Sequence, residues 1–95
     1  MKNKTKADYE AQASVIKAMG HPTRLLILNS LNKKETCVCE LQKLVGDDMS
    51  TVSKHLLVLK NAGLVAARRE GNWLHYRLAC PCVLQFTDCI AGIKK

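Results

Sequence analysis

The chain has 95 residues, with 15 Lys or Arg against eight Asp or Glu, and its formal net charge at pH 7 is +7. The length predicts one domain over residues 1–95, and because the sequence has neither an apolar run of about 18 residues nor a signal peptide, we expect a cytoplasmic protein without a membrane partner. The excess of positive charge favours a polyanionic partner, with nucleic acid first.

The first third of the chain predicts two helices. Residues 1–6 are expected to form a flexible basic tail, and apolar residues at helical spacing predict a helix from about residue 7 to Met19. Gly20 ends this helix, and Pro22 is well placed at the first position of a second helix that ends near residue 32. Arg24, close to the start of the second helix, is expected to make a structural contact.

Residues 37–62 have the pattern of a helix-turn-helix. A short helix is predicted to begin at about Cys37 and to end near Val45, and Gly46 lies in the turn that follows. A further helix, beginning at residue 49 or 50 and ending at 61 or 62, carries apolar residues on one stripe. Two helices joined by a short turn that contains glycine are the usual form of this motif.

After Gly63 the apolar period changes from that of a helix to that of a strand. This change and a tight turn at 70–72 predict a β-hairpin over 64–78. We expect Trp73 and Tyr76 to pack in the core or on the hairpin rather than to stack on bases. A last helix is predicted over 82–93. The predicted fold class is therefore mainly α with a small β-hairpin, arranged as a winged helix-turn-helix.

Polar residues gather where such a fold contacts DNA. The second helix of a helix-turn-helix lies in the major groove, and side chains at its N-terminal end reach base edges. Hydroxyl, Lys and His side chains there suit phosphates and bases, and two arginines near the hairpin tip suit phosphates or a minor groove. Ordinary solvent-exposed charges are the alternative. The predicted DNA contacts are Ser50, Thr51, Ser53, Lys54, His55, Arg68 and Arg69.

Three segments resemble the ArsR/SmtB family of small winged-helix repressors, which sense metals, metalloids or thiol-modifying signals. They are "HPTRLLIL", "STVSKHLLVLKNAGLV" and "RREGNWLHYRL", and the resemblance covers roughly residues 8–80. It implies a homodimer formed through the first and last helices. It also implies that each protomer binds one half of an inverted repeat in double-stranded operator DNA, with half-sites about one helical turn, roughly 34–36 Å, or a multiple of it apart.

Five cysteines are many for a protein of a reducing compartment, where they more often bind metal or do redox work than form disulfides. The segment "ETCVCEL" is similar to the "ELCVCDL" box with which one branch of the family binds arsenite, antimonite or soft divalent metals. The resemblance implies that Cys37 and Cys39 are ligands at the start of the third helix. Thiolates are soft ligands, and a helix N-terminus favours the thiolate over the thiol.

The chain departs from the arsenite pattern at Gln42, where that pattern often has a third cysteine. A third thiolate for As(III) is therefore expected from Cys80, Cys82 or Cys89. The implied inducer is As(III) or another thiophilic ion, without an organic cofactor, and its binding lowers the affinity for DNA. A second family site, built from His and carboxylates of the last helices, is not expected because the last helix offers only Asp88.

Other interpretations of the thiols remain open from the sequence. They are a redox or persulfide sensor that uses a disulfide switch, a repressor that senses Cd, Pb or Zn, a structural zinc site with four thiolates, and inert cysteines, which suits Cys89 best. An enzyme is not expected, because the sequence has no phosphate loop, no acid–base or nucleophile constellation, and no Cys-x-x-Cys in a βαβ context.

Overall fold

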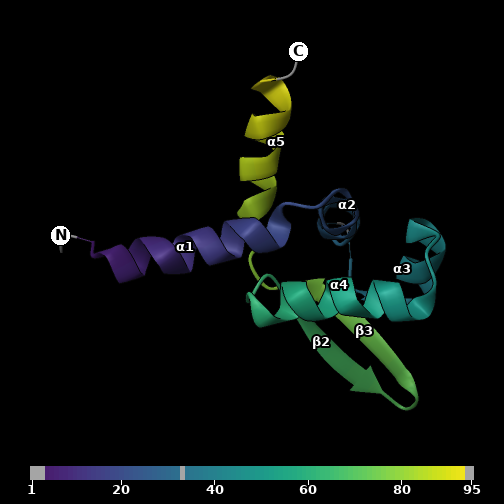
Figure 1. Ribbon diagram of the computed structural model, residues 1–95. Coiled ribbons are helices and arrows are strands. Elements are labelled where there is room, and N and C mark those ends of the chain that lie inside the picture. Colours follow the sequence, from purple (N-terminus) through teal and green to yellow (C-terminus); the bar gives the residue numbers. More distant parts are fainter. Residues whose placement is uncertain (1–3, 33, 94–95) are drawn as a thin grey trace.

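The computed structural model describes residues 4–32 and 34–93, which form a winged helix-turn-helix (Figure 1). This confirms the predicted fold class. The helices are α1 (Lys6–Met19), α2 (Pro22–Ser30), α3 (Val38–Val45), α4 (Met49–Asn61) and α5 (Val83–Ile93), and the strands are β1 (Thr36–Cys37), β2 (Val65–Glu70) and β3 (Trp73–Leu78). Within the described ranges, no helix has the length and apolar character needed to cross a membrane.

The N-terminal helix begins earlier than the predicted tail allows. The side chain of Thr5 accepts a hydrogen bond from the Asp8 N–H at 3.3 Å, and the Asp8 carboxylate accepts one from the Thr5 N–H at 2.8 Å. This capping box satisfies free donors of the first turn, so Lys6 is already helical. The prediction of a flexible tail over 1–6 was therefore wrong for Thr5 and Lys6, and residues 1–3 lie outside the described residues.

The hairpin belongs to a three-stranded antiparallel sheet with the order β1-β3-β2. In β1, Thr36 pairs with Tyr76 and Cys37 pairs with His75. A strand of two residues has no period to recognise, and the sequence did not predict it. As a result Cys37 ends a strand and α3 begins at Val38, one residue later than predicted.

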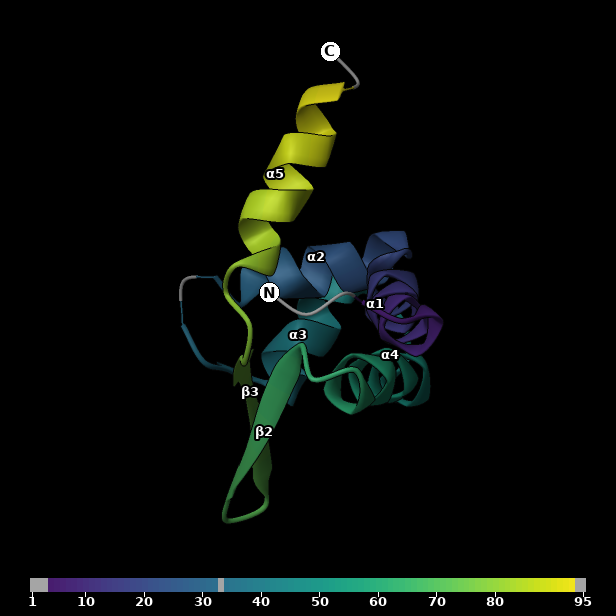
Figure 2. The ribbon, with the colours of Figure 1, turned by 90° about the vertical axis from the view of Figure 1, so that its left-hand side faces the viewer.

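Helix α5 and the hairpin project from opposite sides of the helical body (Figures 1 and 2). Val83 and Leu84, in the first turn of α5, pack against the core, whereas no described residue of this helix is buried. Phe86, Ile90 and Ile93 are exposed. The helix therefore presents an apolar face that this single chain leaves uncovered.

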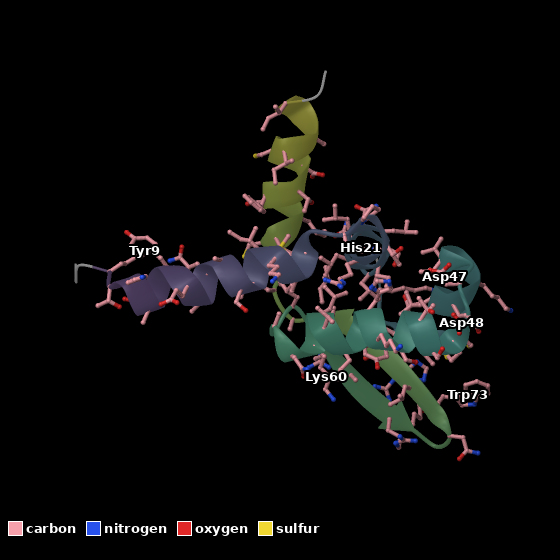
Figure 3. All side chains as sticks on the ribbon, in the orientation of Figure 1. Tyr9, His21, Asp47, Asp48, Lys60 and Trp73 are labelled. Atoms are coloured by element: carbon pink, nitrogen blue, oxygen red, sulfur yellow. The ribbon has the colours of Figure 1, made fainter. Side chains whose placement is uncertain are left out.

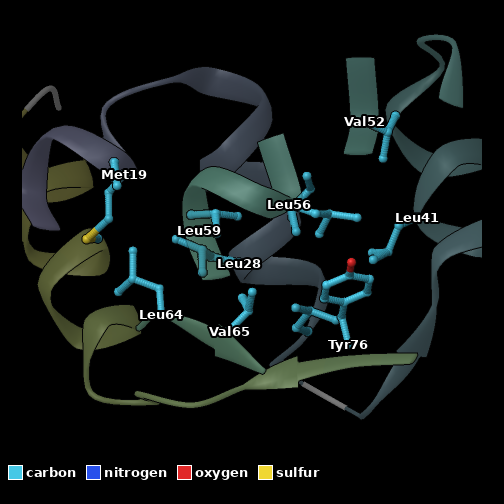
Figure 4. Close-up of a cluster of buried hydrophobic side chains, with 12 residues drawn as sticks. Met19, Leu28, Leu41, Val52, Leu56, Leu59, Leu64, Val65 and Tyr76 are labelled. Atoms are coloured by element: carbon cyan, nitrogen blue, oxygen red, sulfur yellow. The ribbon is translucent and has the colours of Figure 1, made fainter. Parts of the chain in front are cut away.

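One apolar core contains side chains from the four helices α1, α2, α3 and α4 and from the base of the β2–β3 hairpin, which is the wing (Figure 4). Val52, Leu56 and Leu59 of α4 are completely buried, as their helical spacing predicted. Tyr76 is also in this core, which confirms that it packs, but Trp73 is 57% exposed at the far end of the hairpin (Figure 3). The alternative that Trp73 packs in the core was wrong because the core ends before the hairpin tip.

Candidate nucleic-acid interface and thiol pairs

The outer face of α4 begins with small hydroxyls and a lysine. Ser50, Ser53 and Lys54 are exposed, and Thr51 is half-buried. The Ser50 hydroxyl donates to the Asp48 carboxylate at 2.6 Å, and hydrogen bonds from Ser50 and Thr51 lower the pKa of Asp48. Because the positive end of the helix dipole lies at this end of α4, the face suits a phosphate as well as a base edge.

His55 contacts Arg24 and His21 within the protein, although the sequence predicted that it contacts DNA. Its Nδ1 accepts a hydrogen bond from Arg24 Nε at 3.1 Å, and its ring centroid lies 4.5 Å from that of His21. Burial, followed by the charges of His21 and Arg24, lowers the pKa of His55. Arg24 also donates to the Ala18 carbonyl at 3.1 Å, which confirms its predicted structural role. His55 thus joins α4 to the start of α2.

The two wing arginines differ in their surroundings. Arg68 is held by Glu35, with Nη2 2.6 Å from Oε1 and Nε 3.2 and 3.3 Å from the two carboxylate oxygens, and its Nη1 lies 3.2 Å from Glu70. The hydrogen bonds from Arg68 lower the pKa of Glu35, and the two carboxylates raise the pKa of Arg68. Arg69 is exposed and has no ion pair within residues 4–32 and 34–93.

Strand alternation also separates these arginines. Successive side chains of a strand point to opposite faces, so Arg69 shares the face of Val65, which is buried in the core beneath α4. Arg68 lies on the other face, opposite His75 in the register. The sequence missed the Glu35 contact because only the pairing of β1 with β3 brings residues 35 and 68 together.

Cys37 and Cys39 form a thiol pair at the junction of β1 and α3. Their Sγ atoms are 2.8 Å apart, and both residues are half-buried. The hydrogen bond from the Cys39 side chain, with further hydrogen bonds from the N–H groups of Cys39 and Glu40, lowers the pKa of Cys37. The same contact raises the pKa of the Cys39 thiol. Cys37 is therefore the more acidic thiol of the pair.

A second thiol pair lies between β3 and α5. Cys80 and Cys82 have their Sγ atoms 3.2 Å apart, and Cys89 is exposed further along α5. Among the residues that the structure describes, no three or more His, Cys, Asp or Glu side chains are grouped in a way that holds a metal ion. Of the five predicted ligands, one protomer therefore brings together two separate pairs, without the third thiol expected beside Cys37 and Cys39.

Comparison with known proteins gives these features a family context. The profile described as bacterial regulatory protein, arsR family, matches residues 21–67. An uncharacterised HTH-type transcriptional regulator of Methanocaldococcus jannaschii, MJ1325, is 45% identical over 69 residues, which are 72% of this chain and 78% of that protein. The arsenical resistance operon repressor of Escherichia coli is 37% identical over 68 residues, 68% of this chain and 56% of that protein. A cadmium resistance transcriptional regulatory protein CadC homolog of Staphylococcus aureus is 35% identical over 92 residues, 90% of this chain and 76% of that protein.

Solved structures agree with the sequence relatives. The crystal structure of Mycobacterium tuberculosis Rv0081 superposes with a TM-score of 0.81 at 34% identity, covering 94% of this chain and 90% of that one. The solution structure of the homodimeric winged helix-turn-helix domain of Mycobacterium bovis Mb0332 also has a TM-score of 0.81, at 32% identity, covering 99% and 90% of the two chains. Both sequence and fold therefore relate the chain to DNA-binding regulators.

Proposed function

Because the chain belongs to the ArsR family of winged helix-turn-helix transcriptional repressors, we propose that it binds operator DNA as a homodimer and dissociates when a thiophilic ion binds Cys37 and Cys39. The observation that carries the proposal is the 2.8 Å approach of these two sulfurs at the strand–helix junction. The arsenical and cadmium resistance regulators among the relatives support an ion of this class, with As(III) first.

DNA binding in this proposal uses the exposed N-terminal face of α4 and one arginine of the wing. Lys54 and Arg69 supply charge to phosphates, and the hydroxyls beside Lys54 contact phosphates or base edges. Ser50, Thr51 and Ser53 supply those hydroxyls. We assign Arg68 and His55 to contacts within the protein, because Glu35 and Arg24 already hold them.

The homodimer rests on the uncovered face of α5. A groove of about 130 Å³ between α1, α2 and α5 is lined by apolar side chains, among them Ile16, Leu25 and Phe86. A second copy that packs its own α1 and α5 there removes apolar surface from water. The homodimeric state of the related Mb0332 domain supports this arrangement. Two-fold symmetry then presents two α4 helices to an inverted repeat.

The chemistry of the thiol pair suits trivalent arsenic. Arsenous acid, As(OH)₃, loses one hydroxide for each As–S bond that forms, and the proton of the reacting thiol leaves with that hydroxide as water. Cys37 and Cys39 together therefore form two As–S bonds and release two waters, and one hydroxide remains on arsenic. Soft thiolate ligands also suit cadmium, which is the alternative inducer.

The position of the pair connects it to both DNA-binding elements. Cys37 is held in the sheet through its pairing with His75, and Glu35, two residues earlier, is bound to Arg68 of β2. Cys39 lies in the first turn of α3, which packs against α4. An ion that fixes the two sulfurs changes the angle between β1 and α3, and so the position of the wing relative to α4. Such a difference in the contacts of two states is what a coupling between sites requires.

A variant with one remaining thiol pair tests this site. In the Cys80→Ser/Cys82→Ser/Cys89→Ser protein, we expect arsenite to bind at one ion per protomer, with near-UV thiolate–arsenic absorbance and loss of both free thiols. The matched control adds Cys37→Ser and Cys39→Ser, which removes the signal. Absence of binding in the triple variant, with wild-type protein still binding, would show that Cys37 and Cys39 are not sufficient. Absence of arsenite binding in both the triple variant and the wild-type protein would overturn the arsenite proposal and favour a redox switch.

A further inference from the structure

We propose that Cys80 and Cys82 form a second, self-contained two-thiol site for trivalent arsenicals and other soft ions, separate from the pair on β1 and α3. The proposal rests on the close approach of these two sulfurs and on their distance from Cys37. It is independent of DNA release, because it concerns only how many ions the protomer binds and where.

The turn between β3 and α5 holds the two sulfurs near one another. Their Sγ atoms lie 3.2 Å apart, and Pro81 between them restricts the backbone of the turn. The carbonyls of both cysteines accept hydrogen bonds from the start of α5, Cys80 from the Val83 N–H at 3.3 Å and Cys82 from the Gln85 N–H at 3.2 Å. Because the turn is tied to the helix, a ligand that takes both sulfurs needs little rearrangement.

The thiols of Cys80 and Cys82 are more exposed to solvent than those of cysteines that pack in a core. Free cysteine is usually among the most buried residue types and behaves as a small apolar side chain. Cys82 is exposed and Cys80 is only half-buried, and neither belongs to the apolar core. A ligand from solvent therefore reaches both sulfurs.

The course of β3 separates the two thiol pairs. Cys37 lies opposite His75, and the chain then continues along the strand to Leu78, a distance of about 10 Å at roughly 3.3 Å per residue. It remains beside β2 as the Ala79 N–H donates to the Leu64 carbonyl at 3.0 Å, and only then reaches Cys80. The described residues accordingly form no cluster of three or more candidate metal ligands. Within a protomer, Cys80 and Cys82 thus act together and not as donors to an ion on Cys37.

Phenylarsine oxide is a suitable probe because one molecule reacts with two neighbouring thiols. Two As–S bonds form, the As–O bond breaks, and oxygen leaves as water with the two thiol protons, so the reaction needs no oxidant. A single thiol gives an adduct that excess monothiol removes. The isolated Cys89 therefore does not retain the probe after a wash with 2-mercaptoethanol.

The expected result for reduced full-length protein is two retained molecules of phenylarsine oxide per protomer and the loss of four thiols. The Cys80→Ser/Cys82→Ser protein retains one, and the matched Cys37→Ser/Cys39→Ser protein also retains one. Tryptic mapping of the wild-type protein gives a readout that does not depend on any variant. One adduct is expected on the peptide of residues 35–43, and one on the peptide of residues 78–94, where fragmentation places it on Cys80 and Cys82.

Two outcomes would overturn the proposal. One is a single retained molecule per wild-type protomer that links the two peptides, which would show that the pairs share one site. The other is an unmodified 78–94 peptide, which would show that Cys80 and Cys82 do not react together. Neither outcome concerns DNA, so the proposed release by Cys37 and Cys39 stands or fails in its own assay.

Discussion

Replacing Arg69 by Ala is expected to weaken DNA binding and to reduce its dependence on salt, whereas the same change at Arg68 is not. The two arginines are adjacent in β2, but the Glu35 carboxylate already neutralises Arg68. Arg69 is exposed, and it lies on the face of the wing that packs against α4 at Val65. Phosphate contacts release condensed counterions, so each lost contact lowers the salt dependence of the binding constant.

The size of the effect follows from the dimer. One phosphate contact per protomer is lost twice, and at about 0.9 per contact the slope of log K against log salt decreases by about 1.8. Between about 50 and 200 mM salt, wild-type affinity then falls about 12-fold more than that of Arg69→Ala. Arg68→Ala should keep the wild-type slope, because it removes a cation that is already paired.

Fluorescence anisotropy with a labelled duplex, selected from a random library by the reduced protein, measures both slopes. Lys54→Ala serves as a positive control, since this exposed lysine lies on the outer face of α4 and should reduce the slope by a similar amount. A reduced slope for Arg68→Ala together with an unchanged one for Arg69→Ala would refute the assignment of the two arginines.

Three further predictions concern coupling and stability. Glu35→Gln removes the carboxylate that joins Arg68 to the residue before β1, but Arg68 keeps its ion pair with Glu70, so DNA affinity should change little while the arsenite concentration for half-maximal release rises; an unchanged release curve would remove the Glu35–Arg68 ion pair from the coupling. Since the pKa of His55 is lowered in the folded state, chiefly by burial, stability is lost as pH falls through its unfolded value of about 6.5. Unfolding by urea should therefore show that the advantage of wild type over His55→Gln shrinks between about pH 7.5 and 5.5, and a constant difference would contradict this. Leu56→Ala leaves a cavity at a fully buried site and should lower the free energy of unfolding by about 2–5 kcal/mol, whereas Leu57→Ala at an exposed site should lower it by at most about 0.5 kcal/mol. Equal urea midpoints for the two variants would contradict the placement of Leu56 in the core.

The sequence predicted those elements whose signal is local. The spacing of Val52, Leu56 and Leu59 predicted the buried stripe of α4, and Pro22 marked the start of α2. The capping box at Thr5 also has a local signature, with Asp8 three residues later, but the basic composition of the first six residues suggested a tail.

What the sequence could not supply depends on register between distant segments. The pairing of β1 with β3 is a two-residue ladder without any period, yet it places Glu35 beside Arg68 and moves Cys37 from the predicted helix into a strand. His55 has the helical position of a DNA contact, and only the packing of α2 against α4 brings Arg24 to its ring. The thiols presented the same difficulty: their spacing indicates two Cys-x-Cys pairs and the single Cys89, but it does not show whether a third thiol lies beside Cys37 and Cys39.

The most direct test of the account is the release of DNA by arsenite, followed by anisotropy with reduced protein under argon. We expect arsenite to release the wild-type and Cys80→Ser/Cys82→Ser proteins at similar concentrations. Cys37→Ser and Cys39→Ser should bind the duplex with wild-type affinity and stay bound. Release of either of these two variants at the wild-type arsenite concentration would contradict the claim that this thiol pair is the switch.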